Sequence, residues 1–147
     1  MADSAASSRR GDDVADILAG LTLFGDLPRP QLEAVVHTFD EAFFSEGQRV
    51  IRQGFAGAGF FVILDGEASV RADGEEAATL TRGDFFGEVS LLLGEPPIAD
   101  IVATRPLRCL VLAGADLEEF LVQYPRVMYR MVQAQARRLR SAMQWRS

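Results

Sequence analysis

The sequence predicts a mainly β domain with flanking helices, in which an eight-stranded antiparallel jelly-roll barrel lies between N-terminal helices and two C-terminal helices. Apolar residues recur at helical spacing near both ends of the chain. Between them, residues 42–113 alternate short β-rich runs with glycine turns roughly every 8 to 12 residues, which is typical of a sandwich or barrel. A chain of 147 residues, 48% of them apolar, fits one domain with a substantial core.

The N-terminal part is predicted to contain a polar terminus and two helices. Residues 1–11 are small and polar, so we expect a flexible terminus there and a domain that spans residues 12–147. From Asp12 the apolar residues fall at helical spacing, and they are Val14, Ile17, Leu18 and Leu21. Pro30 suits the first turn of a second helix, whose buried face is predicted to be Leu32, Val35, Val36 and Phe39.

The predicted strands follow in the middle of the chain. The eight candidate runs are EAFF, RVIR, GFFVIL, EASVRA, EAATL, DFFGE, IVAT and RCLVLA. Asp73 and Gly74 form a dipeptide that favours a tight hairpin turn between two of these runs. Together they predict a roll over residues 42–113.

The C-terminal helices are predicted over about residues 115–145. Pro125 disfavours helical geometry in the residue before it, so one helix ends near Tyr124 and a helix of about 20 residues begins at Pro125. Four apolar residues of this last helix follow a heptad-like spacing: Val132, Ala136, Leu139 and Met143. Such a seam packs either on the roll or on a second copy of the helix.

The charge is unevenly distributed along the chain. The net charge is −6, yet the residues after Glu119 include six arginines and no acid, whereas the first 119 residues carry nine arginines against 21 acids. This basic helix is expected either to lie against its own acidic body or to contact a protein partner or a second copy. DNA binding is not expected, because a body with a net charge of −12 repels phosphates.

Composition also argues against several classes of function. Cys109 and His37 are the sole cysteine and histidine, so we expect a buried core thiol, a helix-surface imidazole, no zinc site and no metal-dependent enzyme of the jelly-roll type. No cofactor is expected. Because no apolar run is long enough to cross a bilayer, we predict no membrane insertion and a cytoplasmic location. All fifteen basic residues are arginine, which indicates a GC-rich genome and suggests a bacterial source.

Five ordered blocks of the chain carry a resemblance to a known family. They read LFGDLP, EGQRVIRQG, FFVILDGEASV, GDFFGEVSLLLGEPP and ADIVATRPLRCLVL. In this order and spacing the sequence resembles the cyclic nucleotide-binding domain, the sensor module of cAMP receptor proteins and of kinases and channels regulated by cyclic nucleotides. The resemblance covers about residues 14–145. It implies a non-catalytic regulatory module that signals through its C-terminal helix.

The resemblance also implies a ligand site in residues 86–100, which we term the cassette. After Phe86, Gly87 matches the glycine that lets the backbone approach the ligand. Glu88 matches the acid that accepts a hydrogen bond from the ribose 2′-OH, although by itself it could be an ordinary exposed acid or a residue that starts a helix. Val89 and Ser90 match the residues whose N–H groups face the phosphate.

The sequence departs from the family pattern at the other end of the cassette. A Pro-Arg-Ala-Ala-Thr pattern is expected there; Pro96 and the second alanine, Ala99, match it. Pro97 replaces the arginine that neutralises the phosphate, Ile98 replaces the first alanine, and Asp100 replaces the threonine. Some relatives that prefer cGMP carry a threonine directly after the arginine, and Ile98 has no hydroxyl, so this preference is not supported.

Two interpretations therefore stay open. In the first, the cassette binds a cyclic nucleotide weakly, or binds a nucleoside-type ligand without the missing charge. In the second, the fold is a ligand-free protein-interaction or dimerisation module. Other arginines are candidates to replace the missing one, and they are Arg52, Arg71 and Arg82, then Arg130 and Arg137, with Arg105 and Arg108 less suitable.

Overall fold

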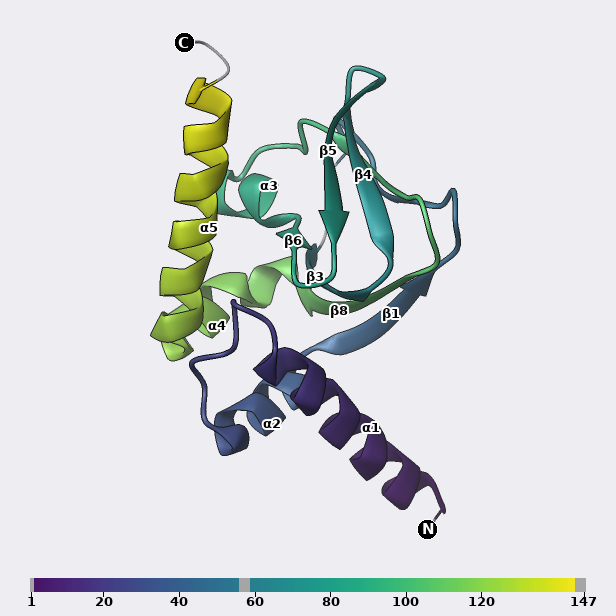
Figure 1. Ribbon diagram of the computed structural model, residues 1–147, viewed down its shortest axis with the longest axis vertical. Helices are drawn as coiled ribbons and strands as arrows, with labels where there is room; N and C mark the ends of the chain where they lie inside the picture. The colour runs from purple at the N-terminus through teal and green to yellow at the C-terminus, as the bar shows by residue number, and fades with distance from the viewer. Residues whose placement is uncertain (1, 56–58, 145–147) are drawn as a thin grey trace. The chain divides into compact units, whose positions relative to one another are not determined.

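The computed structural model describes residues 2–55 and 59–144, and these belong to two compact units (Figure 1). The β unit is Val35–Leu117, and the helical unit combines Met1–Ala34 with Glu118–Ser147. Helix α2 (Arg29–Thr38) crosses the boundary between them. The predicted limits of the domain, residues 12–147, stay a prediction.

The β unit consists of two antiparallel four-stranded sheets. Each of the eight predicted runs contains a strand, and the strands are β1 (Asp40–Phe44), β2 (Arg49–Ile51), β3 (Gly59–Asp65), β4 (Glu67–Ala72), β5 (Glu75–Thr81), β6 (Phe85–Phe86), β7 (Asp100–Ala103) and β8 (Leu107–Ala113). One sheet has the order β1-β8-β3-β6, and the other has the order β2-β7-β4-β5. Asp73 and Gly74 have positive φ values of 54° and 82°, as the predicted β4–β5 hairpin requires.

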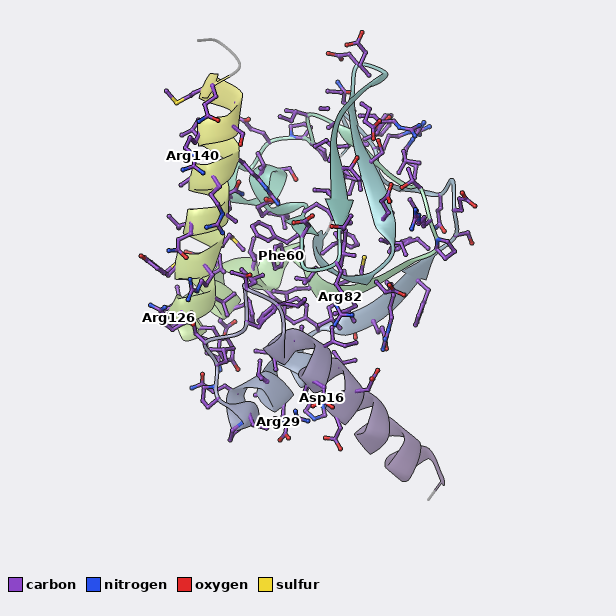
Figure 2. The ribbon with its side chains drawn as sticks, viewed as in Figure 1. Asp16, Arg29, Phe60, Arg82, Arg126 and Arg140 are labelled. Carbon is purple, nitrogen blue, oxygen red and sulfur yellow. The ribbon has the colours of Figure 1, made fainter. Side chains whose placement is uncertain are left out.

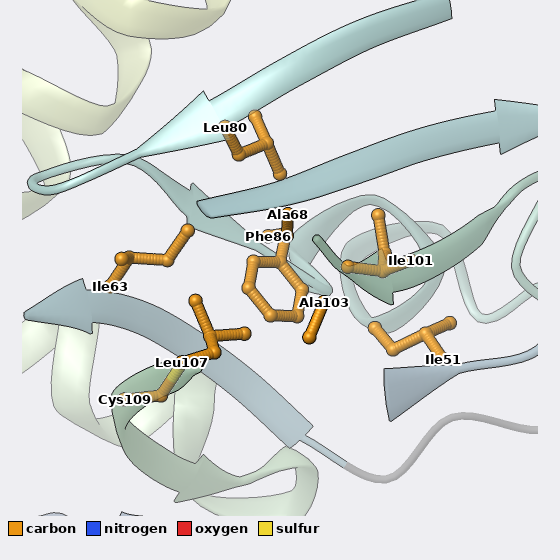
Figure 3. Packing of buried hydrophobic residues seen from close by; sticks show 9 residues of the cluster. All are labelled: Ile51, Ile63, Ala68, Leu80, Phe86, Ile101, Ala103, Leu107 and Cys109. Atoms are coloured by element: carbon orange, nitrogen blue, oxygen red, sulfur yellow. The ribbon is translucent and has the colours of Figure 1, made fainter. Parts of the chain in front are cut away.

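The core of the β unit is formed by apolar side chains from both sheets (Figure 3). Ile63 and Cys109 come from the first sheet, and Ala68 and Ile101 come from the second. Burial raises the pKa of the Cys109 thiol to about 12, so the thiol is an inert core group, as predicted. The sheets are consistent with a jelly roll, but the described strands pair within each sheet and not between sheets, so the predicted closed barrel is not confirmed.

The helical unit begins with α1 (Ala2–Ala19). This helix starts ten residues before Asp12, where the apolar spacing begins, so a helix lies over most of the segment in which a flexible terminus was expected. Alanine and serine fill much of that part, and alanine needs no apolar face to favour a helix. The guanidinium of Arg29 joins α1 to α2 by a hydrogen bond to Asp16, and Figure 2 shows these two residues close together. Arg29 also binds Glu33 one turn along its own helix, at 3.3 Å.

The C-terminal helices have the predicted bounds. Helix α4 (Leu117–Gln123) ends before Tyr124, and α5 (Pro125–Gln144) begins at the proline. Val127 and Met131 are buried, whereas all four residues of the predicted seam are exposed, Val132 by 59%, Leu139 by 62% and Met143 by 63%, with Ala136.

One carboxylate of the helical unit neutralises two arginines of α5. Asp26 accepts hydrogen bonds from Arg130 at 2.7 and 2.9 Å and from Arg126 at 3.0 Å. The hydrogen bond from Arg130 is the main cause that lowers the pKa of Asp26 to about 2. Two arginines in the first turns of the basic helix are thus paired with an acid of the N-terminal segment, whereas packing of the helix on the acidic β unit stays a prediction.

Candidate functional site

The cassette begins at a very short strand. Phe85 and Phe86 of β6 pair with Val62 and Phe61 of β3, and the Phe61 and Phe86 rings are stacked with centroids 4.8 Å apart. Figure 3 shows Phe86 among the buried residues of the core. The predicted site residue Phe86 therefore fixes the start of the cassette by packing in the β unit.

Gly87 makes the turn from β6 into helix α3 (Glu88–Leu93). Its φ of 92° lies in the left-handed region, and a Cβ atom built on it would lie 2.2 Å from the carbonyl oxygen of Gly59. Both the conformation and the contact require glycine. The close backbone approach in the structure is to Gly59, and the approach to a ligand stays a prediction.

Glu88 is the first residue of α3 and is 2% exposed. Among the described residues, Glu88 and Ser69 are the two buried side chains that are polar or charged. Moving a carboxylate out of water costs several kcal/mol unless hydrogen bonds or opposite charges compensate, so such burial requires a partner. The interpretation of Glu88 as an ordinary surface acid is therefore wrong, whereas its role toward a ribose stays a prediction.

The rest of α3 is short and faces largely outward. Val89, Leu92 and Leu93 are exposed, and Ser90 is half-buried, with its hydroxyl donating to the Gly87 carbonyl at a long 3.5 Å. N–H groups in the first turn of a helix have no acceptor within that helix. The amides of Val89 and Ser90 thus stay candidates for contact with an anion.

The C-terminal part of the cassette, residues 96–100, contacts a loop that the sequence analysis did not connect with it. The carbonyl oxygen of Pro97 accepts a hydrogen bond from the Gly54 N–H at 2.8 Å. Ile98 is 72% exposed, and Ala99 is half-buried. Pro97 thus occupies the predicted arginine position with a backbone contact and no charge.

Asp100 uses its carboxylate within the β unit. Its Oδ1 accepts a hydrogen bond from the Gln53 N–H at 2.6 Å, and its Oδ2 lies 3.7 Å from Nε of Arg49. Ile101 and Ala103 of the same strand are in the core cluster, so strand alternation places Asp100 on the opposite face from Ile101. Repulsion between Asp100 and a ligand phosphate is therefore not expected.

The arginines of the β unit that could replace the missing one have other contacts. The Arg52 guanidinium lies over the ring of Phe55, 4.9 Å from its centroid, and Nε of Arg71 donates to Ser69 at 3.3 Å. Arg82 lies exposed on the turn between β5 and β6 (Figure 2).

The remaining candidate arginines are divided between the two units. Arg105 pairs with Glu67 at 3.6 Å, and Arg108 pairs with Glu41. In the helical unit Arg130 is bound to an acid, as described above, whereas Arg137, on α5, is exposed and stays a candidate.

Three residues that shape the cassette escaped the sequence analysis: Gly59, Gln53 and Gly54. Gly59 lies in a glycine-rich run, which is a weak signal of close backbone packing. Gln53 contacts Asp100 across 47 positions, and no local pattern predicts such a pairing.

The site is thus a strand–glycine–helix turn with a buried acid at the start of the helix, in a domain of two antiparallel sheets. The cyclic nucleotide-binding domain family matches residues 41–124, more than half of the chain, and the chain belongs to this family. The cGMP-dependent protein kinases of Eimeria tenella and Toxoplasma gondii are 28% and 29% identical to it over 130 residues. The chain spans 13% of the length of each of these relatives.

Solved structures show the same fold. The structure described as Sp-2Cl-cAMPS bound to PKAR CBD2 has a TM-score of 0.77 at 24% identity and covers 92% of both chains. The catabolite activator protein of Thermus thermophilus has a TM-score of 0.73 at 28% identity, with coverage of 82% of this chain and 59% of that chain. In the described part of the chain, none of the helices has the length and apolar content needed to span a membrane.

Proposed function

We propose that this chain is a non-catalytic regulatory sensor module that binds a cyclic nucleotide weakly, or a related nucleoside-type ligand, in residues 86–99. The family match supports this proposal, as do the structural relatives described as bound to cAMP or to Sp-2Cl-cAMPS. Signalling through α5 and a cytoplasmic location are part of the proposal.

The observation that carries the proposal is the buried carboxylate of Glu88 directly after the left-handed turn at Gly87. A carboxylate in this position is able to accept a hydrogen bond from a ribose hydroxyl in a site that is shielded from water. The family resemblance assigns the same role to Glu88. The sugar-binding part of the site is therefore expected to function.

The proline at position 97 supports weak binding of a charged ligand. Removing one partner of a desolvated charge pair typically costs about 2 to 5 kcal/mol. This corresponds to a loss of affinity of roughly 30- to several-thousand-fold relative to a cassette with the arginine. An uncharged nucleoside loses nothing by this substitution, because it has no phosphate to neutralise.

Calorimetric titration of the whole chain with cAMP, cGMP and adenosine tests the proposal. We expect binding of cAMP and adenosine with dissociation constants in the micromolar to millimolar range, and loss of both upon Glu88→Ala. Glu95→Ala removes an exposed acid of the same cassette and serves as the matched control. Absence of heat and of any thermal shift at millimolar ligand would contradict the proposal.

A second candidate function is a ligand-free interaction or dimerisation module. It is supported by the exposed apolar residues of α5, which recur at heptad-like spacing: Val132, Leu139 and Met143. Sedimentation velocity tests this, since Leu139→Glu should convert a dimer to a monomer. Ser141→Glu adds the same charge outside the seam and should leave the dimer intact. A monomer at all concentrations would exclude the homodimer.

A further inference from the structure

Gln53 connects three segments of the β unit that are distant in sequence. Its backbone N–H donates to Oδ1 of Asp100 at 2.6 Å. Its side-chain Nε2 donates to Oδ1 of Asp73 at 3.0 Å, and its Oε1 accepts from the Asp73 N–H at 3.1 Å. The loop after β2, the β4–β5 turn and the start of β7 are therefore joined at one residue.

The same loop has a second contact with the cassette. Gly54 donates to the carbonyl oxygen of Pro97 at 2.8 Å, so two successive amides of the loop bind residues 97 and 100. Nε of Arg49, from β2, lies 3.7 Å from the other oxygen of Asp100. Because the Asp100 side chain is 24% exposed and its acceptor is charged, the Gln53 bond is stronger than an ordinary amide–carbonyl bond.

These contacts hold the part of the cassette where the family resemblance expects an arginine. An arginine at position 97 would connect this part to the ligand phosphate, so the position of residues 97–100 would depend on whether a ligand is bound. In this chain these residues are hydrogen-bonded to the loop after β2 instead, and those bonds need no ligand. Asp100, at the position of the expected threonine, provides the acceptor.

We propose that Asp100 and Gln53 form a positioning clamp that fixes residues 97–100 whether or not a ligand is bound. A ligand then changes only the N-terminal part of the cassette, residues 87–90, where Glu88 and the first amides of α3 lie. The proposal rests on the proposed function for the identity of the ligand site, but the clamp itself requires no ligand.

Amide hydrogen exchange of the whole chain, followed residue by residue by NMR, tests the clamp. Without ligand, the Gln53 and Gly54 amides are expected to exchange slowly, although Gly54 is exposed and Gln53 is only half-buried. In Asp100→Ala both should exchange about 10- to 100-fold faster, because a hydrogen bond to a charged acceptor is lost. Unchanged exchange at Gly54 in a folded Asp100→Ala variant would overturn the proposal.

Two further variants separate a positioning role from general destabilisation. Asp100→Asn keeps an oxygen acceptor for Gln53 and should restore most of the protection that Asp100→Ala loses. Glu67→Ala removes a comparable carboxylate on β4, which binds Thr104 and Arg105, and should leave Gln53 and Gly54 unchanged. If Glu67→Ala accelerates both amides as strongly as Asp100→Ala, the clamp is wrong.

A ligand titration distinguishes failure of the clamp from failure of the proposed function. With added cAMP, the amides of residues 87–90 should gain protection while Gln53 and Gly54 keep theirs. Gain of protection at Gln53 and Gly54 themselves would overturn the clamp and support the ligand site. If cAMP has no effect but Asp100→Ala still accelerates exchange, the clamp stands and the sensor function fails.

A second substitution keeps the test decisive if Asp100→Ala does not fold. Gln53→Ala removes both side-chain contacts to Asp73 and leaves the backbone donor to Asp100. It should accelerate hydrogen exchange at the Asp73 amide, which loses its acceptor. Because residue 53 connects the segments, exchange at the Gly54 amide should become faster as well. Acceleration at Asp73 alone would show that the segments move independently, which contradicts the clamp.

Discussion

The two ends of the cassette differ in what determines their residues. At the N-terminal part, backbone packing requires Gly87, and the interior holds the carboxylate of Glu88. At positions 97 and 98 of the C-terminal part, the described contact of Pro97 is through its carbonyl oxygen and Ile98 is exposed. A substitution at Gly87 therefore disturbs the β unit, whereas positions 97 and 98 accept other side chains more readily.

This difference explains how a family member can depart from the family pattern. The family resemblance assigns the charge that neutralises a phosphate to one side chain, at position 97, and in this chain the backbone contact of Pro97 with Gly54 is in place without it. The fold therefore persists while the affinity for an anion is free to fall. The following tests first change position 97, then Gly87, and finally Asp26, which is paired with arginines in the helical unit.

The largest effect is expected from restoring the arginine. Pro97→Arg keeps the carbonyl oxygen that Gly54 binds and adds a guanidinium at the expected position. It should raise the affinity for cAMP by roughly 30- to several-thousand-fold, with little change for adenosine. Calorimetric titration of both ligands measures the difference.

Ile98→Arg is the matched control, because it adds the same charge one position later on an exposed residue. It should leave the affinity for cAMP within a few-fold of the original chain. Equal gains from Pro97→Arg and Ile98→Arg would show that general charge, and not the arginine position, controls binding. No gain from either would refute the view that position 97 limits affinity.

The next largest effect is expected on the stability of the fold, when Gly87 in the N-terminal part of the cassette is substituted. Gly87→Ala places a Cβ atom 2.2 Å from the Gly59 carbonyl oxygen in a left-handed conformation. We expect the free energy of unfolding to fall by about 3 kcal/mol or more, since the backbone on both sides must move. Urea denaturation measures the change.

Gly94→Ala is the control at the other end of α3. Gly94 is also left-handed, with φ of 66°, but a Cβ atom there meets nothing within 4 Å. Its cost should be about 1 kcal/mol, from conformation alone. If the two variants lower the free energy of unfolding equally, the close approach of position 87 to the Gly59 carbonyl adds nothing to the cost of a side chain there.

Much of the fold was predictable because local patterns encode it. Glycine turns separate most of the eight runs that form strands, and Pro125 marks the boundary between α4 and α5. Strands pair with partners that are distant in sequence. The sequence therefore could not show that the strands form two sheets, or that the described strands of one sheet do not pair with those of the other. The start of α1 was missed because its first residues have no apolar periodicity.

Less of the candidate site could be predicted from the sequence. The motif marked Gly87, Glu88 and position 97 as candidates, and their role toward a ligand stays a prediction. The burial of Glu88 and the contact between Gln53 and Asp100 depend on how distant segments pack. No spacing within the cassette reports on either of them.

The smallest effect concerns Asp26, where the chain forms the arginine pairing that position 97 lacks. The hydrogen bond from Arg130 lowers the pKa of Asp26 from 3.8 to about 2. A group with a lowered pKa in the folded state stabilises the fold above its ordinary pKa, and this contribution is lost as the pH falls through the lowered value. Asp26→Asn should therefore lower the melting temperature slightly at neutral pH, and the difference should vanish toward about pH 2.

Asp116→Asn provides the comparison for Asp26→Asn. Asp116 is exposed, and the described residues include no arginine partner for it. Its substitution should leave the melting temperature nearly unchanged from neutral to acid pH. If both variants have the same melting temperature at every pH, the pairing of Asp26 with Arg126 and Arg130 does not stabilise the helical unit.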